Sequence, residues 1–531
     1  MVINLWGIVT MSYIIEQKIK GRIYLYEVTN FWDKEKKQSR QKRKYLGPKE
    51  KVYKKSQAQP LVEMEVKPSN FVSKSYGDIF LVEHIQKDLG LTEILKSEFA
   101  SNYKEMLALS AFMLQESSAS YMFHYWHEEH HLEDIKKLNS QNLSNLYEFI
   151  GRNERERFNF LKKWGKNIAP TSGIYYDITS ISSYSNNIEA VEWGYNRDKE
   201  ALPQINIGLT HCSKTNLPLS YSVHPGSIVD VATLKNTIQT FDLFELRNLF
   251  FIMDRGFCSV SNIMQMHKNN MSFIQPLSFN LNKTKEIISK NKQKICKTEN
   301  LFRYKDELLF HINDKIAFEE IEFDVHIFYN EKVALEYKHY LYNAIFDIEA
   351  HIKQLKSLDN LEKSQQYLEN NIHCKYKKYF CIESDTITRN NDEIEEAIFR
   401  AGSFVLLSHG QKLSNLQIIE AYRNRDCVEK DINSLKNHLD TSRIRAHNKD
   451  TANGRLFIKF IALITHSKIM DTIKNDPKLK KYSLNEIMAE LKKLKINSFN
   501  QEKKFLTEIS KKQKLIFKAF AIDLQKIIDG Y

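Results

Sequence analysis

The sequence predicts an α/β fold in which a sheet-forming centre lies between mainly helical regions. Between residues 78 and 166, apolar residues recur at helical spacing with no proline, which is typical of packed helices. After residue 172, short β-rich runs alternate with helical stretches, which is the pattern of a mixed α/β domain. Hydrophobic residues make up 42% of the chain and charged residues 27%, so a packed core is expected.

Composition narrows the class of protein further. Lys and Arg number 78 against 66 Asp and Glu, a net charge of +12 that favours a nucleic-acid partner without proving one. The longest apolar runs, such as 460–465, are far shorter than the roughly 18 residues of a membrane span, so no membrane partner is expected. The apolar first fifteen residues lack preceding positive charge and a small-residue cleavage site, so no signal peptide is expected. The six cysteines are scattered, which favours a reducing compartment.

We predict an N-terminal β-rich basic arm over residues 1–75. The run 22–29 is strand-like, and residues 33–45 hold seven Lys or Arg against two acids. This pattern predicts a small β-hairpin with a basic loop that contacts DNA. The alternative for residues 33–45 is a solvated, disordered charge run.

A helical DNA-binding domain is predicted over residues 76–168, where Ile79, Leu81, Val82 and Ile85 begin the helical periodicity. The chain then changes to strand-like runs at 174–179, 204–211, 217–223, 249–253 and 272–275, with helical stretches at 229–241 and 259–268. Three strands, a helix, a strand, a helix and a strand is the element order of the ribonuclease-H-like fold. Residues 169–280 are therefore predicted to be the first part of such a core.

We predict that residues 281–400 interrupt this core as an insertion. Residues 281–300 hold six lysines and two glutamates, which suggests a surface loop, and 330–371 is charged and helical. Strands are expected at 321–329, 376–383 and 403–408. The core is expected to resume over 401–445, and a C-terminal helical region follows over 446–531.

Three acidic residues stand out by their context. Asp177 lies within the first predicted core strand, and Asp254 directly follows the apolar strand 249–253, at the end of the strand where α/β sheets place ligands. Glu429 lies in a segment that reads as one helix from Ala421 to Asp440. For an isolated acid, a solvated side chain or a helix cap would be the usual interpretation.

Helical geometry places Glu429 beside polar partners. At about 100° per residue, Tyr422, Arg425, Glu429 and Lys436 fall on one stripe about 60° wide. An apolar face of the same helix lies next to that stripe. An acid among cations suits a metal ion and a phosphodiester together, because the acid can hold the metal and the cations can hold phosphate.

These motifs resemble those of a known family. Tyr422-x2-Arg425-x3-Glu429-x6-Lys436 is similar to the signature of the insertion-sequence DDE transposases of the IS-four superfamily. The resemblance extends to further motifs along most of the chain, namely Asp177-Ile-Thr-Ser, 226–234, Asp254-Arg-Gly-Phe, 454–463 and Tyr45-Leu-Gly47.

The resemblance implies a DNA transposase that cleaves at the terminal inverted repeats of an insertion sequence and transfers the 3′ ends to target DNA. It implies that Asp177, Asp254 and Glu429 are catalytic and hold two Mg²⁺ or Mn²⁺ ions per active site. It implies that Tyr422, Arg425 and Lys436 contact DNA phosphates. The partners would be double-stranded DNA, both element ends and target, and a second protomer in a homodimeric synaptic complex. The expected location is the bacterial cytoplasm, at the nucleoid.

Two alternatives remain open at this point. One is a metal-dependent DNA nuclease without strand transfer, and the other is an inactive or domesticated relative that only binds DNA. None of the five tryptophans lies within 281–400, where some relatives hold a flipped base on a Trp, so a base-stacking role there would require Tyr or Phe.

Overall fold

The computed structural model describes residues 12–33, 38–49, 71–116, 119–168, 173–228, 230–244, 250–356, 374–383, 386–499 and 503–528. Residues 1–11 of the apolar start of the chain lie outside the described residues. Residues 357–371 of the helical stretch expected over 330–371 lie outside them as well. The chain divides into two compact units, residues 1–71 with 498–503, and residues 72–497 with 504–531. No helix within the described ranges is long and apolar enough to cross a membrane.

The first unit contains an antiparallel sheet in the order β1-β2-β3. Its strands are β1 (Ser12–Ile19), β2 (Arg22–Asp33) and β3 (Gln38–Pro48). Lys20 and Gly21 both have positive φ, which gives β1 and β2 the tight connection that a two-residue hairpin turn needs. Arg40 and residues 42–44 of the basic run lie on β3 itself and are exposed, so these charges line a strand rather than a loop.

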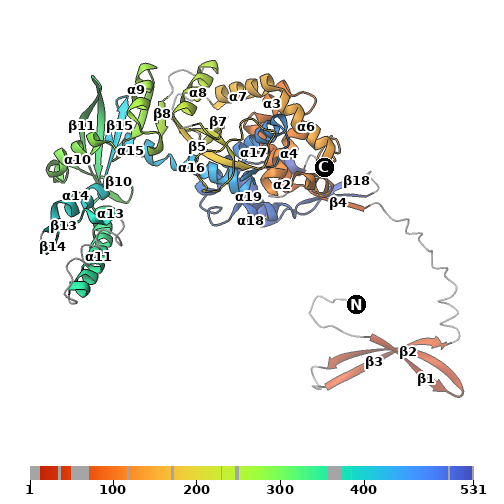
Figure 1. Ribbon diagram of the computed structural model, residues 1–531. Helices are drawn as coiled ribbons and strands as arrows, with labels where there is room; N and C mark the ends of the chain where they lie inside the picture. Colours follow the sequence, from red (N-terminus) through yellow and green to blue (C-terminus); the bar gives the residue numbers. More distant parts are fainter. Residues whose placement is uncertain are drawn as a thin grey trace. The chain divides into compact units, whose positions relative to one another are not determined.

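The second unit begins with helices that pack around one long helix from the C-terminal part of the chain. That helix is α17 (Lys449–Asn475), which contacts α4 and α6 (Figure 1). It is buried along most of its length because apolar side chains cover all its faces, as expected for a helix in a core. The helices preceding the central sheet are α2 (Gly77–Asp88), α3 (Leu91–Glu98), α4 (Tyr103–Gln115), α5 (Phe123–Glu129), α6 (Ser140–Arg152) and α7 (Glu154–Ile168).

A large mixed sheet forms the centre of the second unit, with ten strands in the described residues. Its order is β10-β11-β12-β15-β9-β8-β5-β6-β7, and β16 pairs with the end of β5. The strands are β5 (Gly173–Ser183), β6 (Gln204–Cys212), β7 (Leu217–Pro225), β8 (Phe250–Met253), β9 (Ser272–Pro276), β10 (Leu301–Tyr304), β11 (Glu307–Phe318), β12 (Ile321–Tyr329), β15 (Ser403–His409) and β16 (Arg443–Ile444). The expected α/β class is therefore confirmed.

The first five strands and their helices follow the predicted order. β5, β6 and β7 are antiparallel, and β8 and β9 run parallel to β5. The connecting helices are α8 (Asp230–Leu243) and α9 (Val260–Lys268). Crossover helices are what parallel neighbours such as β5, β8 and β9 require, because a short turn cannot join them.

The stretch 281–400 differs from its prediction in two places. Residues 282–295 form helix α10 (Asn282–Ile295) rather than a surface loop, because Ile287, Ile288 and Ile295 form a buried face opposite the lysines. The expected strand at 376–383 begins instead with a short helix, α13 (Cys374–Lys377), and only Phe380–Glu383 is a strand, β13. β10, β11 and β12 add to the same central sheet.

The rest of this stretch has a small core of its own. Apolar residues of α11 (Glu331–Lys356) pack with those of α14 (Asn391–Gly402) and with Phe380 of β13, which pairs with β14 (Thr386–Arg389). The C-terminal part of the chain contributes the strands β17 (Lys495–Phe499) and β18 (Lys503–Leu506), which form a separate sheet with β4 (Phe71–Ser75) in the order β18-β17-β4. It also contributes the helices α18 (Leu484–Leu491), α19 (Lys511–Ala519) and α20 (Leu524–Ile528).

The segment around Glu429, predicted to be one continuous helix, is divided in the structure. The structure divides it into α15 (Asn415–Arg423) and α16 (Asp426–Asn433), followed by a π-helical turn, Ser434–His438. Tyr422 therefore lies on α15, Arg425 at the break, Glu429 on α16 and Lys436 in the π-helical turn.

Candidate active site

Asp177 lies within β5 and Asp254 directly follows β8, at the same level of two neighbouring parallel strands. The last residue pair between β5 and β8 is Tyr176 with Met253, and the two aspartates come next on each strand. Adjacent strands lie about 4.8 Å apart, so the pairing register alone places the two residues side by side. Gln275 of β9 donates a hydrogen bond to the carbonyl oxygen of Asp254 (2.8 Å), which fixes the backbone where β8 ends.

Glu429 reaches the same place from α16, and Arg425 links all three acids. One Arg425 Nη atom is 3.3 Å from Asp254 Oδ1 and also pairs with Glu429, and the other Nη atom is 3.9 Å from Asp177 Oδ2. Arg425 is the residue at the break between α15 and α16. The structure thus gathers three acids, separated by 77 and 175 residues in sequence, around one guanidinium.

The electrostatics at this place are those of crowded like charges. Burial raises the pKa of the Asp177 carboxyl to about 6, and the negative charges of Asp254 and Glu429 add to that rise. The backbone N–H of Ile178 and the Arg425 cation oppose it. Asp254 and Glu429 have side chains that are 40% and 48% exposed, so a substrate can reach these two carboxylates directly.

The donor set suits hard divalent cations, because it consists of carboxylate oxygens without Cys or His. Within the described ranges, no group of three or more His, Cys, Asp or Glu side chains is arranged to hold a metal ion directly. At this place the Arg425 cation lies between the acids. The residues therefore fit Mg²⁺ or Mn²⁺ by chemistry, while a shared metal position requires the guanidinium to move out.

Tyr422 and Lys436 lie on either side of this cluster along the chain. The Tyr422 ring stacks on Phe404 of β15 with centroids 6.4 Å apart, and burial raises the pKa of its phenol. Lys436, in the π-helical turn, places its Nζ atom 2.7 Å from both carboxylate oxygens of Asp198. Both predicted cations, Arg425 and Lys436, therefore form ion pairs with acids of the same chain.

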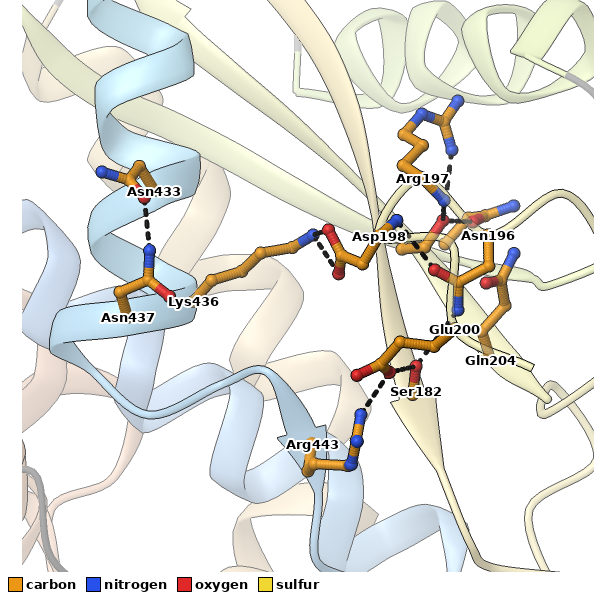
Figure 2. Close-up of polar contacts among 12 residues, drawn as sticks. Ser182, Asn196, Arg197, Asp198, Glu200, Gln204, Asn433, Lys436, Asn437 and Arg443 are labelled. Atoms are coloured by element: carbon orange, nitrogen blue, oxygen red, sulfur yellow. Dashed lines mark hydrogen bonds and ion pairs between the residues drawn. The ribbon is translucent and has the colours of Figure 1, made fainter. Parts of the chain in front are cut away.

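The segment that carries Asp198 joins β5 to β6 and is held by a polar network. Figure 2 shows Lys436 extending from its turn to Asp198, while Arg443 of β16 pairs with Glu200 below. Ser182 of β5 donates to Glu200 (2.5 Å) and accepts a hydrogen bond from Asn196 (3.1 Å). Because Ser182 follows Asp177 by five residues on the same strand, this network fixes the segment beside the strand that carries the first acid.

A second polar cluster lies behind α16 and was not predicted from the sequence. His211 of β6 places Nε2 3.0 Å from Asp431, and Ser467 of α17 donates to the same carboxylate (2.7 Å). Burial by itself lowers the pKa of His211. Hydrogen bonds to Asp431 and Cys427 raise it by a larger amount, so the resulting pKa is about 10. This buried ion pair fastens α16 to the sheet and to α17, two residues after Glu429. The only sequence signal was an acid on the apolar side of the predicted helix.

Comparisons with known proteins place the chain in a family. The model of the Transposase DDE domain matches residues 169–465, which is more than half of the chain and contains Asp177, Asp254 and Glu429. No curated protein matches the chain. A cryo-EM structure of a piggyBac transposase synaptic complex with hairpin DNA is similar over 78% of this chain and 70% of that chain, at 10% identity and a TM-score of 0.31. A likeness of that size decides nothing about this chain. From the family match, the protein belongs to the DDE-domain transposases and is a DNA-cleaving and strand-transferring enzyme.

Proposed function

We propose that Asp177, Asp254 and Glu429 form the catalytic centre of this transposase. The observation that supports this most strongly is their convergence on the Arg425 guanidinium from three separate elements, β5, the end of β8, and α16. The order β7-β6-β5-β8-β9, with β5, β8 and β9 parallel, supports a ribonuclease-H-like core, in which ligands bind at the carboxyl ends of the strands.

The three carboxylates would hold two Mg²⁺ or Mn²⁺ ions. When bound, such ions supply charge neutralisation at the phosphate and lower the pKa of the attacking hydroxyl. In cleavage, a water oxygen bonds to phosphorus while the bond to the 3′ oxygen breaks, leaving a 3′-hydroxyl and a 5′-phosphate. In joining, that 3′-hydroxyl attacks a target phosphodiester: the new P–O bond forms as the bond to the target 3′ oxygen breaks, the attacking hydroxyl loses its proton, and the leaving 3′ oxygen takes one up as a hydroxyl.

The chain's own cations would position the DNA. Once Arg425 leaves the carboxylates, its planar guanidinium can bind a phosphate through two parallel hydrogen bonds. Lys436 would exchange Asp198 for a phosphate oxygen, and the Tyr422 hydroxyl would add a further contact. These assignments are consistent with the Tyr-x2-Arg-x3-Glu-x6-Lys pattern and with membership of the IS-four superfamily within the DDE transposases.

DNA-end recognition is proposed for the arm over residues 1–75 and for the helical domain over 76–168. β3 carries exposed cations at positions 40 and 42–44, which suits a phosphate backbone. The core would comprise 169–280 and 401–445, with 281–400 inserted and 446–531 forming the C-terminal region. Two protomers would hold both ends of the element in a homodimeric synaptic complex.

A cleavage and joining assay on duplex DNA carrying the inverted repeats that flank the coding gene tests this proposal. Glu429→Gln, Asp254→Asn and Asp177→Asn should each abolish cleavage in Mg²⁺ while retaining end binding. Asp426→Asn is the matched control, because Asp426 lies on α16 but pairs with Lys430 instead. Cleavage by any of the three variants at the wild-type rate would remove that residue from the centre. Cleavage without joining would favour a nuclease.

A further inference from the structure

A cavity of about 260 Å³ lies in the second unit, lined by residues of α4, α6 and α17 and by residues 439–445, which follow the π-helical turn. It is far larger than the roughly 15 Å³ that one water needs, and it approaches the small end of ligand pockets. Its lining includes none of the three acids proposed to hold metal, and none of Tyr422, Arg425 and Lys436.

The lining of this cavity is rich in cations. Four cations, Arg443, Arg445, Arg455 and Lys459, face two acids, Glu116 and Asp440. The acids already have partners, since Asp440 pairs with Arg445 (3.0 Å) and Glu116 with Lys492 (2.7 Å). Arg443 pairs with Glu200 outside the cavity. In the described part of the chain, Arg455 and Lys459 are the lining cations with no carboxylate within ion-pair distance.

Arg455 has an unsatisfied donor. Its Nε atom is buried and has no hydrogen-bond partner among the described residues, while its guanidinium stacks over the Tyr147 ring at 5.1 Å. The preceding Gly454 permits this, because a Cβ there would lie 1.9 Å from the Tyr147 carbonyl oxygen. The close approach of α17 to α6 therefore holds Arg455 at the cavity wall.

Lys459 lies one helical turn after Arg455, on the same face of α17. Its Nζ atom donates to the carbonyl oxygen of Asp440 (2.6 Å), a neutral partner. Burial lowers the pKa of this ammonium to about 7, with Arg455 and Arg445 adding to the fall and Asp440 opposing it. A cation held in such surroundings is costly unless an anion compensates it.

We propose that this cavity binds a phosphate group through Arg455 and Lys459, either a phosphodiester of the DNA backbone or free phosphate. A guanidinium group beside an ammonium group is a donor pair that suits phosphate oxygens. The anion would accept the hydrogen bond that the Arg455 Nε–H otherwise lacks. The site adjoins residues 439–445, so an occupied cavity would brace the segment that leads out of the Glu429 helix. The proposal stands independently of the catalytic triad.

Phosphate binding to the full chain tests this, with inorganic phosphate as the probe in calorimetry. Arg455→Lys and Lys459→Met should each weaken phosphate binding roughly 10- to 100-fold, the size expected for losing hydrogen bonds to a charged group. Lys474→Met, an exposed lysine near the other end of α17, is the matched control and should bind phosphate like wild type. Wild type that binds no phosphate, or variants that bind it like the control, would overturn the proposal.

A competition experiment identifies the source of the phosphate. If short duplex DNA displaces inorganic phosphate from wild type, the phosphodiester is the ligand. If DNA and phosphate bind together, the site takes the free anion. Arg455→Lys retains a cation and serves as the milder variant should Lys459→Met fail to fold. Because this readout requires neither cleavage nor metal, it is separate from the test of Asp177, Asp254 and Glu429.

Discussion

Lys436 and Asp198, 238 residues apart in sequence, form an ion pair in which the ammonium lies 2.7 Å from each carboxylate oxygen. The Lys436 side chain is only 12% exposed, so Asp198 takes up much of its hydrogen-bonding capacity. If Lys436 binds DNA, a phosphate must replace this carboxylate. In the chain without DNA, Lys436 would then be paired with Asp198, and it would become available to DNA only when that pair breaks.

Replacing Asp198 should therefore strengthen DNA binding. We expect Asp198→Asn to raise affinity for duplex DNA about 3- to 10-fold at low salt, because a partly exposed ion pair contributes about 1 kcal/mol. Fluorescence anisotropy over a salt series measures this. Lys436→Met is the companion variant and should lower the salt slope by about one. If Asp198→Asn weakens binding as much as Lys436→Met does, the pair positions the lysine rather than competing with DNA.

Arg425 should oppose metal binding in the absence of DNA. Two unit charges 4 Å apart interact by roughly 4 kcal/mol at an effective dielectric constant of 20, so removing the guanidinium leaves the carboxylates more attractive to a divalent ion. We expect Arg425→Gln to bind Mn²⁺ at least tenfold more tightly than wild type without DNA, yet to cleave DNA more slowly.

Calorimetry with Mn²⁺ measures the affinity, and Arg423→Gln is the matched control. Arg423 is the last residue of α15 and pairs with Glu307 rather than with the three acids. Unchanged or weaker Mn²⁺ binding by Arg425→Gln would show that the guanidinium does not occupy the metal position. For wild type, the same reasoning predicts tighter Mn²⁺ binding when DNA is present, because DNA draws Arg425 away.

The His211–Asp431 pair should make stability depend on pH. The folded-state pKa of His211, about 10, lies above its ordinary value of about 6.5. The stabilisation is therefore fully present below pH 6.5 and is lost as the pH rises through 10. Asp431→Asn should lower the free energy of unfolding by about 3 kcal/mol at pH 6.5, since it leaves a buried charge unpaired.

Denaturant unfolding at pH 6.5 and pH 10 checks this difference. The destabilisation caused by Asp431→Asn should shrink at pH 10, where His211 is losing its proton in the wild type as well. Ser467→Ala removes the hydroxyl contacts to Asp431 and to the Leu463 carbonyl oxygen, keeps the ion pair, and should cost about 1 kcal/mol. A destabilisation by Asp431→Asn that is equal at both pH values would contradict the ion-pair assignment.

The strands nearest the site could be predicted because their local pattern agrees with their tertiary surroundings. β6 and β8 are buried along their length; β6 ends one residue beyond the expected run, and β8 lies within the expected run. Helix α10 was harder to predict because lysines dominate its sequence and its apolar face is narrow. That face stabilises the helix only through packing against the rest of the fold. At the break between α15 and α16, Arg425 contacts acids from β5 and from the end of β8, and such contacts are not visible in the local sequence pattern.

The side chains with which the site residues pair could not be predicted from the sequence. Asp198 reads as an ordinary loop acid, and nothing in its neighbourhood signals a lysine 238 residues away. His211 and Asp431 likewise meet only because α16 packs on β6. By contrast, Asp177 and Asp254 could be selected because each lies in or after an apolar strand. Strand position is local information, whereas pairing depends on the completed fold.

The number of metal ions bound per chain shows whether Asp177, Asp254 and Glu429 act as one metal-binding centre. Electron paramagnetic resonance of Mn²⁺ titrated into the protein–DNA complex counts the bound ions. We expect two ions per chain for wild type and for Asp426→Asn, and one or none for Asp177→Asn, Asp254→Asn and Glu429→Gln. Two ions retained in any of those three variants would contradict it.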